Sequence, residues 1–246
     1  MERQNIKQHI DSYRQELRLA VHHPILNREL GEVELDSTKA FFLLLPLLNG
    51  EKWTESMNVA AVAIGVVHAA FDAHDAIELY DATSTQQQLR VLSGDYFSGV
   101  HYKLLASLPD VGFIHALSKT IGQINEMKTN FHNHSPNGPQ EIRETIQMIE
   151  AGCIIRFFRS FGFSRYIPLV SAALPILTMD PEAGRLAGRP TIQTVLGWKI
   201  EEKDADQVVA ELSSTIDETI NNADFLSPFL KVDIQDMTTS LLGKLI

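Results

Sequence analysis

The chain has 246 residues, of which 44% are hydrophobic, and this is enough apolar material to bury one substantial core. A formal net charge of −10 and an isoelectric point near 5.3 exclude a general nucleic-acid binder, because phosphate affinity depends on clustered Lys and Arg. A single cysteine, Cys153, excludes an intramolecular disulfide and a thiolate zinc cage.

The N-terminal residues are polar and lack the apolar core of a signal peptide, so we expect no export. The most apolar stretches, residues 40–48 and 59–71, fall short of the roughly 20 residues that a membrane-spanning helix needs. We therefore expect buried helices, no membrane span and a cytoplasmic protein.

Apolar residues recur every three or four positions almost throughout, whereas strand alternation is scarce. The predicted class is therefore all-α. The expected helices lie at residues 6–20, from about 39, from 56 through 68–80, at 88–107, 114–132, 141–161 and 168–179, from 181, and at 204–220 and 233–246. The pattern at 191–199 is short and ambiguous.

Local signals set the boundaries of these helices. Pro24 ends the first one, a residue among 36–38 caps the second, and Ser56 caps the third. The polar run from Asp81 and the loop from Asn133 separate the following helices. About nine or ten helices with short connections, no repeat and no linker predict one compact helical bundle, a single domain over residues 1–246.

Two segments of the predicted helices carry a recognisable pattern. The first, from His68, reads H-A-A-F-D-A-H-D-A-I-E-L, and the second, from Gly94, reads G-D-Y-F-S-G-V-H-Y-K-L-L. They resemble the substrate-facing helices of trans-type polyprenyl diphosphate synthases, H-x-x-S-x-x-H-D-D-x-x-D and A-x-L-x-G-D-Y-L. The matching positions are His68, His74, Asp75, Gly94, Asp95 and Tyr96. The resemblance implies an isoprenoid-synthase-like bundle around a central cavity.

Most of the family's acidic metal motif is replaced in this chain. Its second and third aspartates would be Ala76 and Leu79. In the family these carboxylates hold magnesium across an allylic diphosphate, and the first and last of them share a helix face. Here that face keeps only Asp75, which indicates a relative that has lost catalysis.

The acidic residues that remain in this region recur every third position: Asp72, Asp75, Glu78 and Asp81. At 3.6 residues per turn this row winds around the helix. We interpret it as a solvated or partner-facing ridge, and a residual magnesium contact through Asp75 and Glu78 is the alternative.

Other parts of the family's catalytic pattern are also changed. Where the family has basic residues for isopentenyl diphosphate, Lys39 remains, but Ala40 and Phe42 replace arginines. The arginine pair that follows the first motif is missing, and residues 146–246 contain no Asp-Asp pair. We expect no catalytic residues, no metal site and no cofactor in this chain.

The resemblance is best over residues 35–165, and the chain is similar to one branch, the small subunit (component I) of bacterial heptaprenyl diphosphate synthase. In that branch a separate catalytic component II carries the aspartate motifs and magnesium. The heterodimer extends farnesyl diphosphate with isopentenyl diphosphate to the C35 product for the menaquinone side chain. The resemblance implies a regulatory subunit that is inactive alone and needed for activity and product length.

The six matching residues and two phenylalanines are the predicted contacts with the partner or with the isoprenoid chain. Alternatively, the two histidines are structural residues that are packed or hydrogen-bonded inside the protein. Gly94 is expected to allow close helix approach, and Asp95 and Tyr96 are expected to make buried hydrogen bonds. Two consecutive phenylalanines, Phe157 and Phe158, cannot both face one core on an isolated helix. One of them is therefore a candidate for a subunit interface. A place for both in the core, where most aromatic stripes lie, is the alternative.

Two other readings remain open from sequence. His74 and Asp75, with His22 or His23 upstream, also match the metal site of HD-type phosphohydrolases loosely. A helical adaptor unrelated to prenyl transfer is the second alternative.

Overall fold

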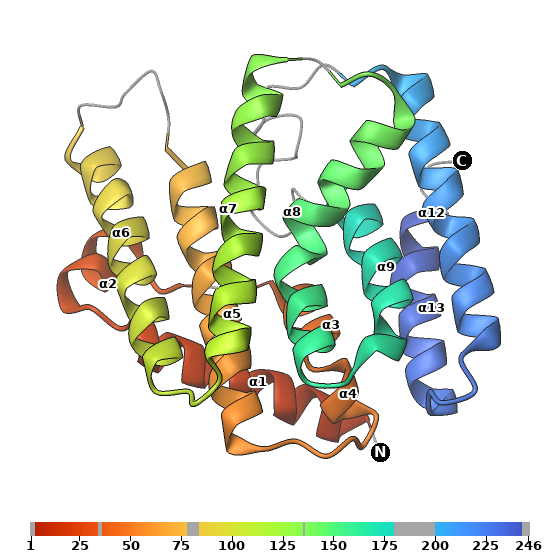
Figure 1. The fold of residues 1–246 in the computed structure, drawn as a ribbon, viewed down its shortest axis with the longest axis horizontal. Helices are drawn as coiled ribbons and strands as arrows, with labels where there is room; N and C mark the ends of the chain where they lie inside the picture. Colours follow the sequence, from red (N-terminus) through yellow and green to blue (C-terminus); the bar gives the residue numbers. More distant parts are fainter. Residues whose placement is uncertain (1–2, 34–35, 78–83, 135, 180–199, 243–246) are drawn as a thin grey trace. The chain divides into compact units, whose positions relative to one another are not determined.

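The computed structural model describes residues 3–33, 36–77, 84–134, 136–179 and 200–242. Within these ranges the chain forms eleven α-helices and one 3-10 turn, with no strand, which confirms the all-α prediction (Figure 1). The helix expected from residue 181 and the ambiguous segment at 191–199 lie outside the described ranges. The chain divides into two compact units, Met1–Ile114 and His115–Ile246. The prediction of a single domain stays a prediction.

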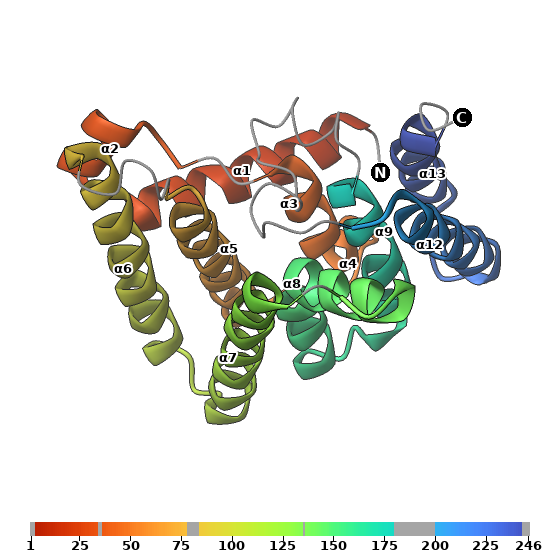
Figure 2. The same ribbon diagram turned by 90° about the horizontal axis from the view of Figure 1, so that it is seen from above.

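The first unit is built around two long helices that pack side by side, α5 and α6 (Figures 1 and 2). Helix α1 also packs against α5, and the short α2 packs against α6. The helices of this unit are α1 (Arg3–Val21), α2 (Pro24–Leu30), α3 (Ser37–Leu43), α4 (Leu45–Leu48), α5 (Glu55–Asp75) and α6 (Thr85–Ala106), followed by the first residues of α7 (Val111–Asn133).

Helix α5 is the core helix of this unit, because every residue from Ala60 to Ala70 is buried. A helix that is apolar on all sides belongs either in a protein core or in a membrane. By length and composition alone α5 could cross a membrane, which corrects the expectation that no segment is long enough. In the structure, 61% of its most apolar window is buried against neighbouring helices.

Close contact between α1 and α5 depends on a tyrosine and a glycine. The Tyr13 hydroxyl donates a hydrogen bond of 2.9 Å to the Ala61 carbonyl oxygen. Complete burial raises the pKa of Tyr13 above its ordinary value, so the phenol remains a proton donor. A Cβ atom at Gly65 would collide with that hydroxyl. The absence of a side chain at residue 65 therefore sets how closely the two helices pack.

Two helix starts differ from the sequence expectation. Helix α5 is capped by Thr54, whose Oγ1 accepts a 3.2 Å hydrogen bond from the Met57 amide, and not by Ser56. Pro24 ends α1 but also begins α2, where the His23 ring accepts from the Leu26 amide at 3.4 Å. Proline suits the first position of a helix, so one residue serves as stop and start.

The second unit packs α9 (Ile167–Met179) against α8 (Pro139–Ser160), α12 (Glu202–Asn222) and α13 (Pro228–Leu242). Between α8 and α9 lie Gly162 and the 3-10 turn Ser164–Tyr166. Gly162 has a φ of +82°, a left-handed conformation that favours glycine. This conformation allows the chain to reverse so that α9 packs back on α8.

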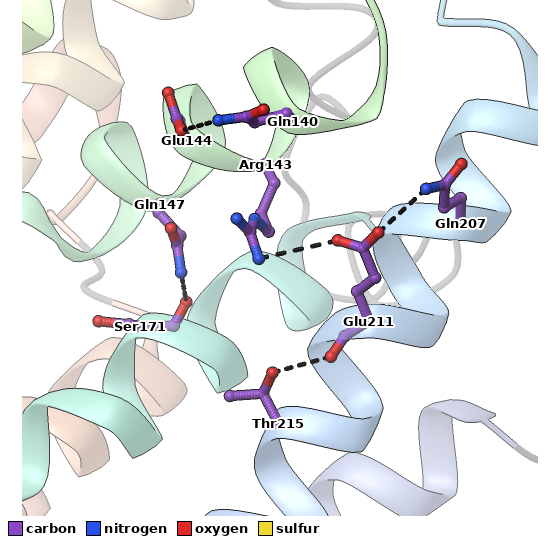
Figure 3. A network of polar contacts seen from close by, with 8 residues as sticks. All are labelled: Gln140, Arg143, Glu144, Gln147, Ser171, Gln207, Glu211 and Thr215. Atoms are coloured by element: carbon purple, nitrogen blue, oxygen red, sulfur yellow. Dashed lines mark hydrogen bonds and ion pairs between the residues drawn. The ribbon is translucent and has the colours of Figure 1, made fainter.

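Polar contacts connect α8 to the two helices beside it (Figure 3). Arg143 Nη1 lies 3.7 Å from Glu211 Oε2, and Gln207 donates to the other oxygen of that carboxylate at 3.0 Å. Gln147 Nε2 donates to the Ser171 carbonyl oxygen at 2.8 Å, which ties α8 to α9. Half-exposed ion pairs contribute at most about 1 kcal/mol, so these contacts orient α8 more than they stabilise it.

We predict that Gly65→Ala lowers the free energy of unfolding by about 1–3 kcal/mol, because the new methyl group meets the Tyr13 hydroxyl inside a packed core. Urea denaturation of the purified chain measures this. The matched control is Gly99→Ala in α6, where no atom beyond the chain neighbours and the backbone of the same helix lies within 4 Å of the added Cβ, and there we expect a gain of up to about 1 kcal/mol. Equal stability of the Gly65→Ala variant and the parent would contradict the packing argument.

Candidate functional site

The sequence-predicted residues of the first unit gather where α5 ends beside α6. His68 lies in the buried stretch of α5, with 2% of its surface exposed and its ring edge-on to Phe71. Asp75 is the last residue of α5 and is partly buried, and Asp72 is exposed one turn earlier. The histidine therefore belongs to the core, while the carboxylates lie at the edge of the helix.

His74 and Gly94 are in direct contact across the two helices. A Cβ atom at Gly94 would lie 2.5 Å from the imidazole carbon and nitrogen of His74. The missing side chain makes room for the ring, which agrees with the expectation that Gly94 allows close helix approach. His74 itself is exposed at its other side.

The next two residues of α6, Asp95 and Tyr96, lie in different surroundings. Asp95 is exposed, so the expectation of a buried hydrogen bond at this carboxylate is wrong. Each residue advances 100° around a helix, and because Gly94 faces α5, Asp95 points away from it. Tyr96 is half-buried, and its ring lies 5.2 Å from that of His23. Its hydroxyl donates to the His22 carbonyl oxygen at 3.2 Å, but this hydrogen bond is exposed, so the expectation of a buried one is wrong here as well. Tyr96 thereby connects α6 to the α1–α2 turn.

Phe157 and Phe158 lie in the second unit, and both are completely buried. The expectation that one of them faces a subunit interface is therefore wrong. The chain turns back after α8, so Phe163 covers both rings, at centroid distances of 6.1 Å from Phe157 and 6.2 Å from Phe158. Tyr166 extends the cluster to Phe225, 5.0 Å away. Whether either ring lines an isoprenoid cavity stays a prediction.

The described residues do not fit a magnesium site. Asp72 and Asp75 are three positions apart, and in the described part of the chain no three His, Cys, Asp or Glu side chains come together to hold a metal ion. The same finding gives no support to the HD-type metal site, although His22, His23, His74 and Asp75 are all described. Glu78, Leu79 and Asp81 lie outside the described ranges.

Arg90 is a residue of this region that the sequence analysis did not single out. Its Nη1 donates a 2.8 Å hydrogen bond to the carbonyl oxygen of Ala76, the C-cap of α5. A positive charge at this position also interacts favourably with the negative end of the helix dipole. Arg90 borders a hollow of about 230 Å³ between α2, α5 and α6. Arg90 and Ala76 are fourteen residues apart in the sequence, so no local pattern predicted this contact.

A family model described as heptaprenyl diphosphate synthase (HEPPP synthase) subunit 1 matches residues 23–224. The chain belongs to this family. Membership argues against an adaptor unrelated to prenyl transfer.

One relative carries the same family description. Heptaprenyl diphosphate synthase component 1 of Geobacillus stearothermophilus is 25% identical over 95 residues, which are 39% of this chain and 43% of that protein. The chain thus matches less than half the length of this relative.

A similar fold occurs in heptaprenyl diphosphate synthase from Staphylococcus aureus, with a TM-score of 0.61 at 13% identity over 97% of this chain and 92% of that one. Geranylgeranyl pyrophosphate synthetase from Geoglobus acetivorans gives a TM-score of 0.63 at 14% identity over 96% of this chain and 97% of that one. Geranylgeranyl pyrophosphate synthase from Corynebacterium glutamicum, in complex with calcium and isoprenyl diphosphate, gives a TM-score of 0.63 at 13% identity over 98% of this chain and 96% of that one. These similarities confirm the isoprenoid-synthase-like fold class.

A second buried histidine of the subunit, His101, also joins α6 to α5. Its Nδ1 donates to the Ala63 carbonyl oxygen at 3.3 Å, and only 2% of the residue is exposed. Burial lowers the pKa of His101 below its ordinary value of 6.5, because the apolar surroundings disfavour the charged ring, although the hydrogen bond to Ala63 acts in the opposite direction.

We therefore predict that the subunit loses stability as the pH falls below about 6.5. In that range the unfolded chain binds a proton at residue 101 that the folded chain resists, so the free energy of unfolding decreases. Urea denaturation between neutral and mildly acidic pH measures the slope. His101→Gln should flatten it, whereas His115→Gln at an exposed position of α7 should leave it unchanged. The same slope in the parent and in His101→Gln would contradict this assignment.

Proposed function

We propose that this chain is the non-catalytic, regulatory subunit of a heterodimeric heptaprenyl diphosphate synthase and acts with a catalytic component II. The match of residues 23–224 to the subunit 1 family is the observation that carries the proposal. The complex would condense farnesyl and isopentenyl diphosphates to a C35 diphosphate in the cytoplasm, for the menaquinone side chain. The partner would supply the magnesium ions and the carboxylates that bind them.

The end of α5 supports a non-catalytic role. Ionising an allylic diphosphate requires several carboxylates around magnesium. Asp75 is followed by Ala76, and Asp72 is exposed one turn before it, so the described end of α5 offers no converging carboxylates. The chain from residue 146 onward has no Asp-Asp pair. Catalysis would therefore rest with the partner.

The outer face of α6 is the surface on which we place the catalytic subunit. Leu92 and Tyr102 are large apolar side chains that are 57% and 59% exposed. Asp95, Gly99 and Ala106 are exposed as well. These five residues follow one another at intervals of three or four, so they form one stripe along the helix, named here the α6 stripe. Partly exposed leucine and tyrosine beside an open glycine suit close packing of a partner helix.

The chemistry of the product explains how a non-catalytic subunit could set its length. A C35 isoprenoid is apolar along its whole chain, and each Å² removed from water contributes about 25 cal/mol. A subunit that extends or closes the apolar wall of the partner's cavity would determine where the chain stops growing. This role needs no carboxylate on the regulatory subunit.

We expect activity only when the two subunits are combined. The assay uses magnesium, farnesyl diphosphate and labelled isopentenyl diphosphate with this chain alone, the catalytic chain alone and an equimolar mixture, and product length is read by chromatography. Enzyme-like turnover by this chain alone would refute the non-catalytic role. Equal rates and products with and without this chain would refute the subunit role.

We also expect Leu92→Glu with Tyr102→Glu to weaken the complex at least tenfold, because two buried carboxylates at the interface would lack partners. Sedimentation velocity measures the affinity, and the mixed assay should lose activity in parallel. The matched control is Val232→Glu on α13, a position 48% exposed in the second unit, which should bind like the parent. Full affinity in the doubly substituted chain would exclude the α6 stripe as the interface.

A further inference from the structure

A groove in the second unit runs along α8 between α7 and α9 and has a volume of about 410 Å³. Its apolar lining comes from Met127 on α7, Met148 and Ile155 on α8, and Ile167 on α9. Gly152 lies between the two α8 residues, and Met148 Sδ would be 2.9 Å from a Cβ atom there. The groove thus has an apolar floor formed by three helices of one unit.

One end of this groove is cationic. Arg156 and Arg159 both border it, and they are one turn apart on the same face of α8. Arg156 is half-buried, and its Nε donates to Thr120 Oγ1 at 3.3 Å. That hydroxyl in turn donates to the Ala116 carbonyl oxygen at 3.0 Å. The relay holds the guanidinium in place and leaves its two terminal nitrogens for a ligand.

No carboxylate among the described residues pairs with either arginine. The two arginines thus keep their positive charge uncompensated by an acidic side chain, although the chain as a whole has a net charge of −10. Guanidinium groups bind phosphate through paired hydrogen bonds, and two of them together match the charge of a phosphate monoester. The arginine end of the groove therefore suits a phosphate group.

The opposite end of the groove is bordered by an acidic residue. Glu144 borders it and accepts a hydrogen bond of 2.9 Å from Gln140. Gln147 also borders this end, and its side chain donates a hydrogen bond to the Ser171 carbonyl oxygen. An anionic group is thus repelled from this end. From Arg156 to Met148 the helix rises about 12 Å, and between these two residues α8 contributes only Gly152 and Ile155 to the lining.

We propose that this groove binds an amphiphile with a phosphate headgroup, with the phosphate on Arg156 and Arg159 and the apolar chain along Ile155 toward Met148. The catalytic partner is not needed for this binding. The inference goes beyond the subunit role, and it is tested on this chain alone, so its failure would leave that role intact.

Octyl phosphate is the probe, and the methyl groups of the six methionines, labelled with carbon-13, report where it binds. We expect the NMR signals of Met127 and Met148 to shift on titration, while those of Met57 and Met237 stay in place. Arg156→Gln combined with Arg159→Gln should weaken binding at least tenfold. The control is Lys119→Gln, which removes one positive charge at an exposed position of α7 outside the groove, and its affinity is expected to stay within twofold of the parent.

Two further titrations separate the headgroup from the apolar chain. Inorganic phosphate should bind at least tenfold more weakly than octyl phosphate. Octanol should also bind at least tenfold more weakly than octyl phosphate. Equal affinity for inorganic phosphate would refute the amphiphile and leave an anion site. Equal affinity for octanol, or unchanged affinity in the variant lacking both arginines, would refute the phosphate site.

A conservative variant guards against loss of folding. Thr120→Val retains both charges and nearly the same volume but removes the acceptor for Arg156 Nε. We expect several-fold weaker binding of octyl phosphate by a chain whose circular dichroism and melting temperature match the parent. Unchanged affinity in this variant would refute the role of the hydroxyl relay.

Discussion

The tight packing of α5 is the constraint on which the first unit depends. All of its residues from 60 to 70 are buried, on every face of the helix, which is possible because most of their side chains are small. Where a neighbour comes closest, a glycine makes room for it, as Gly65 does for Tyr13 and Gly94 does for His74. The space in a packed core does not adapt to an added methyl group without cost, so these positions fix how α1 and α6 lie against α5. The outward direction of the α6 stripe follows from that geometry.

This packing also explains how the family fold can persist without the acidic motif. Helix α5 is stabilised by the stretch Ala60–Ala70, whereas Asp72 and Asp75 come after it at the edge of the helix. Replacing carboxylates there changes the chemistry of the surface and leaves the core contacts in place. The chain accordingly has the fold of catalytic prenyl synthases at only 13–14% identity. The proposed division of labour between two subunits is consistent with this separation of fold and motif.

In the second unit, different faces of α8 serve different purposes. Phe157 and Phe158 pack inward under Phe163, Arg143 reaches Glu211 on α12, and Arg156 borders the groove beside α7. The inward face provides the stability, because aromatic rings bury large apolar areas. The polar contacts hold the helix at a set rotation, and that rotation keeps the two arginines on the side of the groove.

The sequence by itself determined the helical class, most of the long helices and the altered metal motif, because apolar periodicity and residue identity are local properties. It also indicated the family through residues 68–79 and 94–105. Only the tertiary structure decided that Phe158 is covered, that Asp95 points outward, and that Arg90 binds the end of α5. Burial and hydrogen bonding at these positions depend on neighbours that are distant in the chain or lie beyond a turn. A helical pattern states which residues share a face, but the packing of other helices determines which face remains open.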